Sequence, residues 1–271
     1  MGSARTRTNR ERLAVEAILR DHLMRDSGTR DVMRLGILQT DAVRDDFQSE
    51  FGDYPGMFHG ILSQGAETEP LEFTNYDVRR EEYPERLADC DGYLITGSRD
   101  SVYDDAQWIR TLGEFVLELD TTRTPLIGIC FGHQLIAHVL DGETAPADVG
   151  WTVGVHTSEV LAQQAWMTPC RASFRLISSH RDQVVTLPSR AVLFAASEIC
   201  PNGGYTIDGH ILTFQGHPEF EPEYAARLMT SRRELLGEQR FAVGMASLAQ
   251  RIDSVLIAKW IVNFISVARR A

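Results

Sequence analysis

Cys130 is the residue of this sequence whose surroundings most clearly predict chemistry. It stands between Gly128 and Gly132, after a short apolar run at residues 126–129 and before a helix-like run at residues 135–140. Gly-x-Cys-x-Gly is the cysteine form of the nucleophile elbow, a strained strand-to-helix turn that lifts the side chain above a sheet. A Cβ at either glycine would collide across so tight a turn. The pattern therefore predicts a cysteine nucleophile.

The helix expected after Cys130 would also activate its side chain. Backbone N–H groups at a helix N-terminus, together with the positive end of the dipole, favour a thiolate over a thiol. The alternative is a structural cysteine at the end of a buried strand, because free cysteine is among the most buried residue types. The elbow motif alone leaves both interpretations open.

His217 and Glu219 supply the groups that a cysteine nucleophile needs. They lie in a turn after the apolar run at residues 211–214, with Gly216 before them and Pro218 between them. A nucleophile requires a base, and the base requires a carboxylate that fixes its tautomer and orientation. His-Pro-Glu alone is typical of a surface turn, but downstream of a cysteine elbow it predicts a catalytic pair.

These segments together resemble the class I glutamine amidotransferases, which have a Cys-His-Glu triad. The residues at 128–134 and 216–219 match that family in order and in approximate spacing. Residues 91–98 resemble the strand and oxyanion turn that precede the nucleophile, and residues 179–184 resemble the family's Ser-His-x-Asp-x-Val segment. The resemblance covers about residues 33–235.

The resemblance implies a γ-glutamyl thioester on the cysteine, which water hydrolyses to glutamate. His217 would take up the thiol proton and return it to the departing amine, while Glu219 orients His217. The resemblance further implies an oxyanion hole from backbone groups and a substrate pocket. The oxyanion residues are Gly97 or Ser98 with Phe131, and the substrate-binding residues are Gln134, Ser179 and His180.

Two branches of this superfamily share features with the chain. Residues 38–40, 52–55 and 97–105 are most similar to stand-alone members related to the amidotransferase part of GMP synthetase. The γ-glutamyl peptidases also have a glycine at the position of Gly216. The GMP synthetase domain usually has a bulkier residue there. Glutamine and other γ-glutamyl compounds therefore both remain candidate substrates.

Three functions are compatible with these motifs. The preferred one is independent hydrolysis of γ-glutamyl amides or peptides. The alternative is a glutaminase subunit that passes ammonia to a separate synthase, because no synthase domain fits in this chain. A non-catalytic regulatory relative is disfavoured by the presence of Cys130, His217 and Glu219 together.

Further candidates have plainer interpretations. His133 and His138 could be metal ligands on one helix face, but no third ligand is placed near them, so we expect no metal site. His180 and Asp182 could form a catalytic pair, although pocket lining through backbone groups is favoured. Trp151 either walls the pocket or belongs to the core. An apolar stripe near the C-terminus indicates a packed helix, with a homo-oligomer interface as the alternative: Leu248, Ile252, Val255, Leu256, Trp260, Ile261 and Phe264.

Composition narrows the class of protein. The net charge of −11 argues against nucleic-acid or anionic-membrane partners. Lys259 is the only lysine, so no Walker-A motif and no ATP site are expected, and we predict no cofactor. The cysteines are widely spaced without a C-x-x-C pair, and no signal peptide or long apolar span is found. These features predict a cytoplasmic enzyme.

The order of predicted elements indicates an α/β fold. Strands at residues 33–39, 71–78, 91–96 and 126–129 alternate with helices at 47–62 (broken at Pro55) and 105–119. After residue 149 strands dominate, at 152–160, 174–177, 192–196, 204–207 and 211–214, with a hairpin turn at Asp208-Gly209. The expected architecture is a mixed, mostly parallel, flavodoxin-like sheet flanked by helices.

The domain organisation follows from the same patterns. Residues 1–31 are expected to be a partly helical extension, with a helix at residues 11–26. Residues 32–240 form the predicted catalytic domain. Residues 241–271 are expected to be a C-terminal helix packed on it, centred on residues 245–267 and preceded by a helix at 221–236.

Overall fold

The computed structural model describes residues 32–270. The predicted N-terminal extension and its helix lie outside the described residues. The chain divides into two units, and the second begins at Met33.

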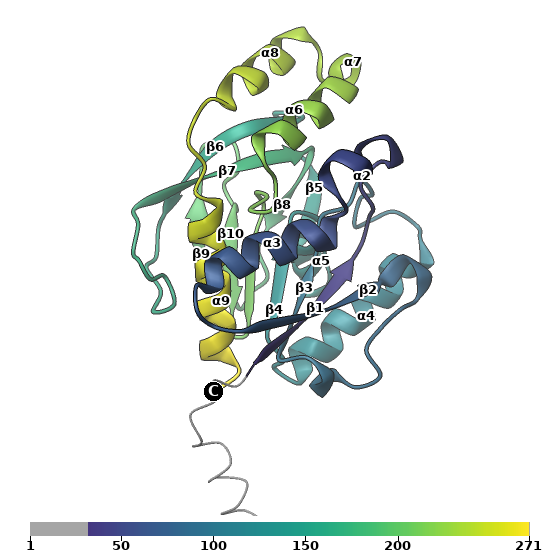
Figure 1. The fold of residues 1–271 in the computed structure, drawn as a ribbon, viewed down its shortest axis with the longest axis vertical. Coiled ribbons are helices and arrows are strands. Elements are labelled where there is room, and N and C mark those ends of the chain that lie inside the picture. Colours follow the sequence, from purple (N-terminus) through teal and green to yellow (C-terminus); the bar gives the residue numbers. More distant parts are fainter. Residues whose placement is uncertain (1–31, 271) are drawn as a thin grey trace, which may run out of the picture. The chain divides into compact units, whose positions relative to one another are not determined.

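A nine-stranded mixed sheet forms the centre of this unit, in the order β2-β1-β3-β4-β11-β10-β9-β6-β7 (Figure 1). Its first half is parallel, since β1 pairs with β2 and β3, and β4 pairs with β3 and β11. Apart from the edge strand β2, these strands are apolar and almost wholly buried, as parallel strands covered on both faces must be. They are β1 (Met33–Gln39), β2 (Leu71–Asp77), β3 (Gly92–Ile95), β4 (Leu126–Ile129) and β11 (Ile211–Phe214).

The second half of the sheet is antiparallel. A turn at Asp208 and Gly209 joins β10 to β11 in the predicted hairpin, and both residues have positive φ angles. The strands of this half are β6 (Thr152–Val160), β7 (Ser173–His180), β9 (Ala191–Ala196) and β10 (Gly204–Ile207). A separate two-stranded sheet pairs β5 (Glu143–Pro146) with β8 (Asp182–Thr186).

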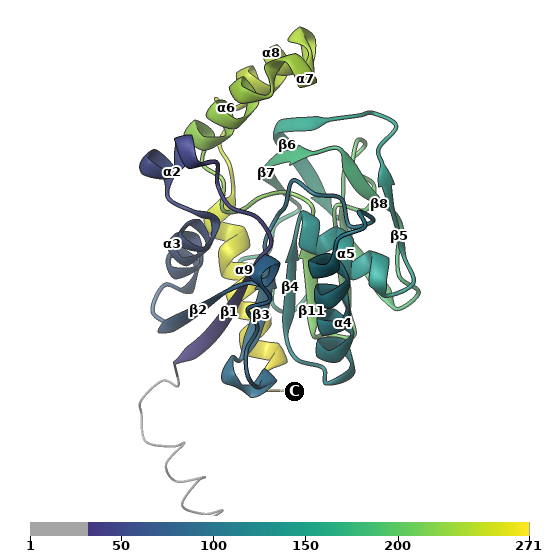
Figure 2. The same cartoon turned by 90° about the vertical axis from the view of Figure 1, so that its right-hand side faces the viewer.

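Helices cover both faces of the large sheet (Figure 2). On one face α3 (Tyr54–Ala66) and α9 (Ser254–Ala268) share a core with β1, and a Cβ on Gly65 would lie 2.5 Å from the backbone of Ala258. On the other face lie α4 (Gln107–Thr121) and α5 (Phe131–Val139). The remaining helices before α9 are α2 (Asp45–Phe51), η1 (Val78–Arg80), η2 (Leu87–Asp89), α6 (Pro222–Ser231), α7 (Arg233–Leu236) and α8 (Glu238–Ser247).

We call α6–α8, residues 222–247, the helical cap. The cap contacts the large sheet through α8, where a Cβ on Gly154 of β6 would lie 2.8 Å from the carbonyl oxygen of Gly244. The hydroxyl of Ser247 accepts a hydrogen bond from the backbone N–H of Val155 at 2.8 Å. Figure 1 shows the cap at the top of the view, above β6 and β7.

The mixed α/β fold and the predicted strands are confirmed, with boundaries that differ by a few residues. The strands β5 and β8 were not predicted, because they are short and partly polar. The continuous helix expected at residues 245–267 is wrong: α8 ends at Ser247 and α9 begins at Ser254. Pro55 does not break a helix; it lies in the first turn of α3, which begins after the capping side chain of Asp53.

The apolar stripe of the C-terminal helix faces the protein core. Trp260, Ile261 and Phe264 of α9 are almost fully buried with strand β1, whereas Val255 is exposed. Within residues 32–270 no helix combines the length and apolar character needed to cross a bilayer.

Candidate active site

Cys130 lies on a strained turn between β4 and α5. Its φ and ψ angles are 50° and −95°, a combination that side-chain-bearing residues rarely adopt. A Cβ on Gly128 would lie 2.7 Å from the backbone of Gly132, and a Cβ on Gly132 would lie 2.7 Å from the carbonyl oxygen of Ile95. The prediction that both glycines are required is therefore confirmed. The absence of a Cβ at Gly128 and Gly132 allows β3, β4 and α5 to approach this closely, and this close approach forms the elbow.

The carboxyl ends of the parallel strands meet at this elbow. In open α/β sheets ligands bind at this edge. After β1, Thr40 is fully buried, and its hydroxyl donates to the carbonyl oxygen of Gly97 at 2.9 Å. The hydroxyl of Ser98 donates to the carbonyl oxygen of Thr40 at 3.2 Å. These bonds fix the turn after β3 beside the elbow after β4.

His217 follows β11 and forms a buried pair with Glu219. The distance between His217 Nδ1 and Glu219 Oε1 is 2.7 Å, and each residue is at most 5% exposed. The imidazole stacks on the ring of Phe220 with 4.0 Å between centroids, and the backbone N–H of His217 donates to the carbonyl oxygen of Ile177 on β7. The contacts with Glu219 and Phe220 therefore orient the imidazole, and the bond to Ile177 fixes the backbone of His217.

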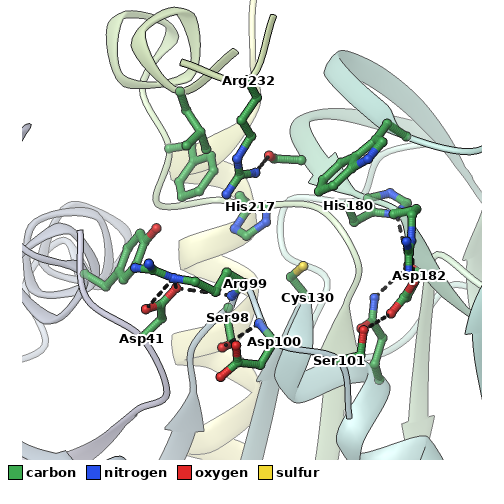
Figure 3. A pocket seen from close by; sticks show the side chains of 18 of the residues that line it. Asp41, Ser98, Arg99, Asp100, Ser101, Cys130, His180, Asp182, His217 and Arg232 are labelled. Carbon is green, nitrogen blue, oxygen red and sulfur yellow. Dashed lines mark hydrogen bonds and ion pairs between the residues drawn. The ribbon is translucent and has the colours of Figure 1, made fainter. Parts of the chain in front are cut away.

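The ionisation of His217 is set by competing effects. Burial opposes the charged imidazolium, but the Glu219 carboxylate and the Cys130 sulfur outweigh it and raise the pKa of His217 to about 10. In the described part of the chain, His217 Nε2 is buried and has no hydrogen-bond partner. A Cβ on Gly97 would lie 2.9 Å from His217 Cε1 and 3.6 Å from Cys130 Cβ, so these residues adjoin one another. Figure 3 shows the imidazole and the cysteine sulfur at the same pocket.

A cavity of about 390 Å³ opens above Cys130. It brings together most of the residues predicted for the site: Gly97, Ser98, Cys130, Gln134, Ser179, His180 and His217. Phe131 lies beside the cavity as the first residue of α5, and Glu219 lies behind His217. Trp151 also lines the cavity, which favours the pocket-wall interpretation of that residue.

Gln134 and His180 use their side chains to hold neighbouring backbone. The amide of Gln134 donates to the carbonyl oxygen of Asp182 at 2.7 Å and to Gln215 Oε1 at 3.1 Å. His180 Nδ1 contacts the same carbonyl oxygen at 3.1 Å, and burial, reinforced by the nearby charge of His217, lowers the pKa of His180 to about 3. The Asp182 carboxylate instead accepts from Ser101 at 2.5 Å. His180 and Asp182 therefore do not form a catalytic side-chain pair.

His133 and Gly216 have structural reasons for their presence. His133 is fully buried, contacts the hydroxyl of Thr213 through Nδ1 at 2.9 Å, and has its pKa lowered to about 3 by burial. A Cβ on Gly216 would lie 2.9 Å from the Cβ of Leu176, because β7 approaches the His217 turn closely. Gly216 does not line the 390 Å³ cavity. Packing alone accounts for this glycine.

Several residues of the cavity were not predicted from the sequence. Asp41 is 4% exposed, and its carboxylate accepts from Arg99 Nε at 2.8 Å and from Arg79 at 3.0 Å. This ion pair supports the turn after β3. Arg232 reaches the cavity from the cap (Figure 3). Residues so distant in sequence form no local motif from which their place in the cavity could be predicted. The one indication was that the polar residue Asp41 follows soon after a buried strand.

A cysteine on an elbow, facing a histidine that a buried carboxylate orients, has the geometry of a cysteine-dependent acyl-transfer enzyme. The Glutamine amidotransferase class-I family model matches residues 53–233. The chain belongs to this family.

Individual relatives agree with this assignment. The chain is 31% identical over 223 residues to Gamma-glutamyl peptidase 3 of Arabidopsis thaliana, covering 78% of this chain and 89% of that protein. It is 29% identical over 159 residues to a glutamine-hydrolysing GMP synthase of Porphyromonas gingivalis, covering 58% of this chain and 30% of the synthase. A solved glutamine amidotransferase of Thermotoga maritima has the same fold, with a TM-score of 0.68 at 18% identity over 88% of this chain and 99% of that one.

Proposed function

We propose that the protein hydrolyses γ-glutamyl amide bonds through a thioester on Cys130. The observation that carries this proposal is the placement of Cys130 and the His217–Glu219 pair at one cavity. Membership of the class I glutamine amidotransferases and the likeness to a γ-glutamyl peptidase support the same chemistry.

The reaction follows from the positions of the side chains. The sulfur of Cys130 attacks the γ-carbonyl carbon, and His217 holds the thiol proton on Nε2, the nitrogen that Glu219 leaves free. The tetrahedral intermediate collapses as the C–N bond breaks, and His217 gives its proton to the departing amine. Water then attacks the thioester, with His217 as base, and glutamate and the free thiol are released.

Backbone N–H groups would stabilise the oxyanion. Phe131 is the first residue of α5, where an N–H has no acceptor within its own helix. The carbonyl of Gly97 points to Thr40, so in a trans peptide the N–H of Ser98 points in the opposite direction. We assign Ser98 and Phe131 as the donors, and Gly97 as the residue whose missing Cβ leaves room for the His217 ring.

Gln134, Ser179 and His180, which the resemblance implies as substrate-binding residues, all line the cavity. The amide nitrogen of Gln134 already donates to protein acceptors. We therefore assign Gln134 and His180 to shaping the pocket through the backbone of residues 179–182, against which the γ-glutamyl group would lie.

The second candidate function is ammonia donation to a separate synthase. The similarity to a GMP synthase favours this function, because the matched part covers only 30% of that longer protein. If the chain were a partner-dependent subunit, docking would have to move the oxyanion turn into its competent position. Here the turn is already pinned by Thr40 and Asp41, which favours independent hydrolysis.

The deciding experiment uses the purified chain alone. We expect hydrolysis of glutamine or of γ-glutamyl peptides without an added protein and with little effect of ATP. A diazo-ketone glutamine analogue should label Cys130 and leave Cys90, Cys170 and Cys200 unlabelled. A chain that is inert to every such compound until a synthase is added would establish the ammonia-donor function instead.

A further inference from the structure

The buried amide of Gln215 contacts the sulfur of Cys130. Gln215 follows β11 directly and is 2% exposed. Its Nε2 lies 3.5 Å from Cys130 Sγ, a distance that suits an N–H donor and the large sulfur atom. In the part of the chain that the structure describes, this is the side chain that makes a hydrogen bond to the sulfur, since His217 Nε2 makes none.

The register of the sheet fixes this contact. Parallel pairing of β4 with β11 places Ile129 opposite Phe214, and the next residues of the two strands are Cys130 and Gln215. The backbone N–H of Cys130 donates to the carbonyl oxygen of Phe214 at 2.9 Å. The backbone N–H of Gln215 donates to the carbonyl oxygen of Gly203 at 3.0 Å. The amide and the sulfur are therefore held beside each other by paired strands.

A chain of hydrogen bonds determines which end of the Gln215 amide faces the sulfur. Gln134 Nε2 lies 2.7 Å from the carbonyl oxygen of Asp182, which can only accept, so the nitrogen of Gln134 must be on that side. The same nitrogen donates to Gln215 Oε1 at 3.1 Å. With its oxygen turned to Gln134, Gln215 presents its N–H group to Cys130. The amide is a donor to the sulfur and cannot accept from it.

Such a donor acts on the charge of the sulfur. A neutral amide does not take up or release the thiol proton, which remains the task of His217. An N–H bond to a charged acceptor is stronger than one to a neutral acceptor, and a bond to the charged form favours that form. The Glu219 carboxylate and the Cys130 sulfur raise the pKa of His217 to about 10, so the imidazolium persists opposite the sulfur at neutral pH.

We propose that Gln215 is a catalytic residue that stabilises the thiolate of Cys130, and that Gln134 positions it for this role. The S–H bond breaks, its proton forms an N–H bond on His217 Nε2, and the electron pair left on the sulfur accepts the hydrogen bond of Gln215. This inference rests on the proposed function of the site. Gln215 does not line the 390 Å³ cavity, so it acts on the sulfur and does not contact the substrate.

Alkylation by iodoacetamide tests the state of the sulfur directly, because the thiolate is the reactive form. Cys130 opens onto the cavity, where a small reagent can reach it (Figure 3). In a Cys170→Ala background, which removes an exposed cysteine, mass spectrometry follows the peptide that contains Cys130. Gln215→Met keeps the length of the side chain without a donor. It should slow alkylation about five- to tenfold at about pH 7.

Gln183→Met is the matched control. Gln183 is also a buried glutamine, 5% exposed, but its Nε2 donates to the carbonyl oxygen of Ile199 at 2.8 Å. This substitution should leave the alkylation rate of Cys130 unchanged. A native rate in Gln215→Met, or the same loss in the control, would overturn the proposal.

A second variant tests the positioning role of Gln134. Gln134→Met keeps the Gln215 amide but frees it to rotate, so alkylation should slow by only about two- to threefold. Added to Gln215→Met, it should slow the reaction no further, because both act through one contact. Circular dichroism checks that each variant folds. If Gln215→Met does not fold, a native alkylation rate in Gln134→Met overturns the proposal.

Turnover kinetics separate this inference from the proposed hydrolysis. Alkylation needs no substrate, so a slower rate in Gln215→Met supports the role of the amide even if no γ-glutamyl compound is hydrolysed. Where glutamine or a γ-glutamyl peptide is turned over, Gln215→Met should lower kcat about tenfold with KM nearly unchanged. A rise in KM at constant kcat would show that Gln215 acts on the substrate pocket and would overturn the proposal.

Discussion

The catalytic loops and the helical cap contribute to one cavity but are built differently. The catalytic loops, residues 96–98, 130–132 and 215–219, are packed so closely against their neighbours that a Cβ on Gly97, Gly132 or Gly216 would displace a neighbouring atom. The cap reaches the cavity through long side chains, chiefly that of Arg232. This side chain contacts the ring of Trp151 and the hydroxyl of Ser179. Interiors this tightly packed tolerate little change, whereas surface side chains are replaceable.

The contrast indicates a division of labour. Proton transfer requires reacting atoms at fixed positions, which short strand-to-loop turns provide. Substrate selection requires groups that can vary without disturbing those turns. Changes to the catalytic loops should therefore act on kcat, and changes at the cap should act on KM.

The largest effect is expected at Cys130. Cys130→Ala should reduce kcat by about a thousandfold or more, since the nucleophile is lost. The fold should remain, because the strained turn is held by Gly128 and Gly132, which are unchanged. Activity assays and circular dichroism measure the two outcomes, and Cys170→Ala, at an exposed cysteine, is the control. An alanine variant that retains more than about a tenth of the activity would remove Cys130 from the chemistry.

The next effect separates the members of the buried pair. His217→Ala should lower kcat more than Glu219→Gln by about tenfold or more, because Glu219 orients the imidazole without accepting its proton. The isosteric Gln keeps a group near Nδ1, 2.7 Å away in the native chain. Single-turnover kinetics for both variants test this order. If both variants are as active as the native chain, the turn after β11 is structural only.

The same contrast explains what the sequence could predict. The residues Gly128, Cys130 and Gly132, and the His-Pro-Glu run, are local patterns, because the turn that positions each side chain is encoded within a few residues. The mixed sheet followed from apolar runs bounded by turn residues. The family and the enzyme class are confirmed, and the catalytic roles of individual residues stay predictions.

Contacts between distant segments could not be predicted in this way. Nothing in the run Ser231-Arg232-Arg233 indicates which arginine faces the cavity; that depends on how α6 ends and on Trp151, which lies far earlier in the chain. The edge pair β5 and β8 lacks a clear alternation of apolar and polar residues. These strands form because they pair with each other across a long stretch of sequence. The β-propensity of single residues does not predict such pairing.

A smaller effect is expected on stability at alkaline pH. The pKa of His217 is raised from 6.5 to about 10 in the folded state. Such a group stabilises the fold fully below about pH 6.5, and this contribution is lost as the pH rises through about 10. Glu219→Gln removes one cause of the shift. Urea unfolding from about pH 6 to about pH 10 should show the native chain losing stability more steeply than Glu219→Gln. Parallel curves would mean that the pair is not coupled as the geometry indicates.

The smallest effect is expected at Ser179, where the cap meets the sheet. Its hydroxyl accepts one hydrogen bond from Arg232, at 3.1 Å. Ser179→Ala removes that support but leaves the Trp151 ring beneath the guanidinium, so KM should rise only about two- to fivefold, with kcat unchanged.

Combined with Arg232→Gln, the Ser179→Ala substitution should add almost nothing to the rise in KM, because the effects of residues that act through one contact are not additive. A double-mutant cycle on KM measures this directly. Full additivity would show that Ser179 contacts the substrate itself, and a fall in kcat would show that the cap and the catalytic loops are not separable.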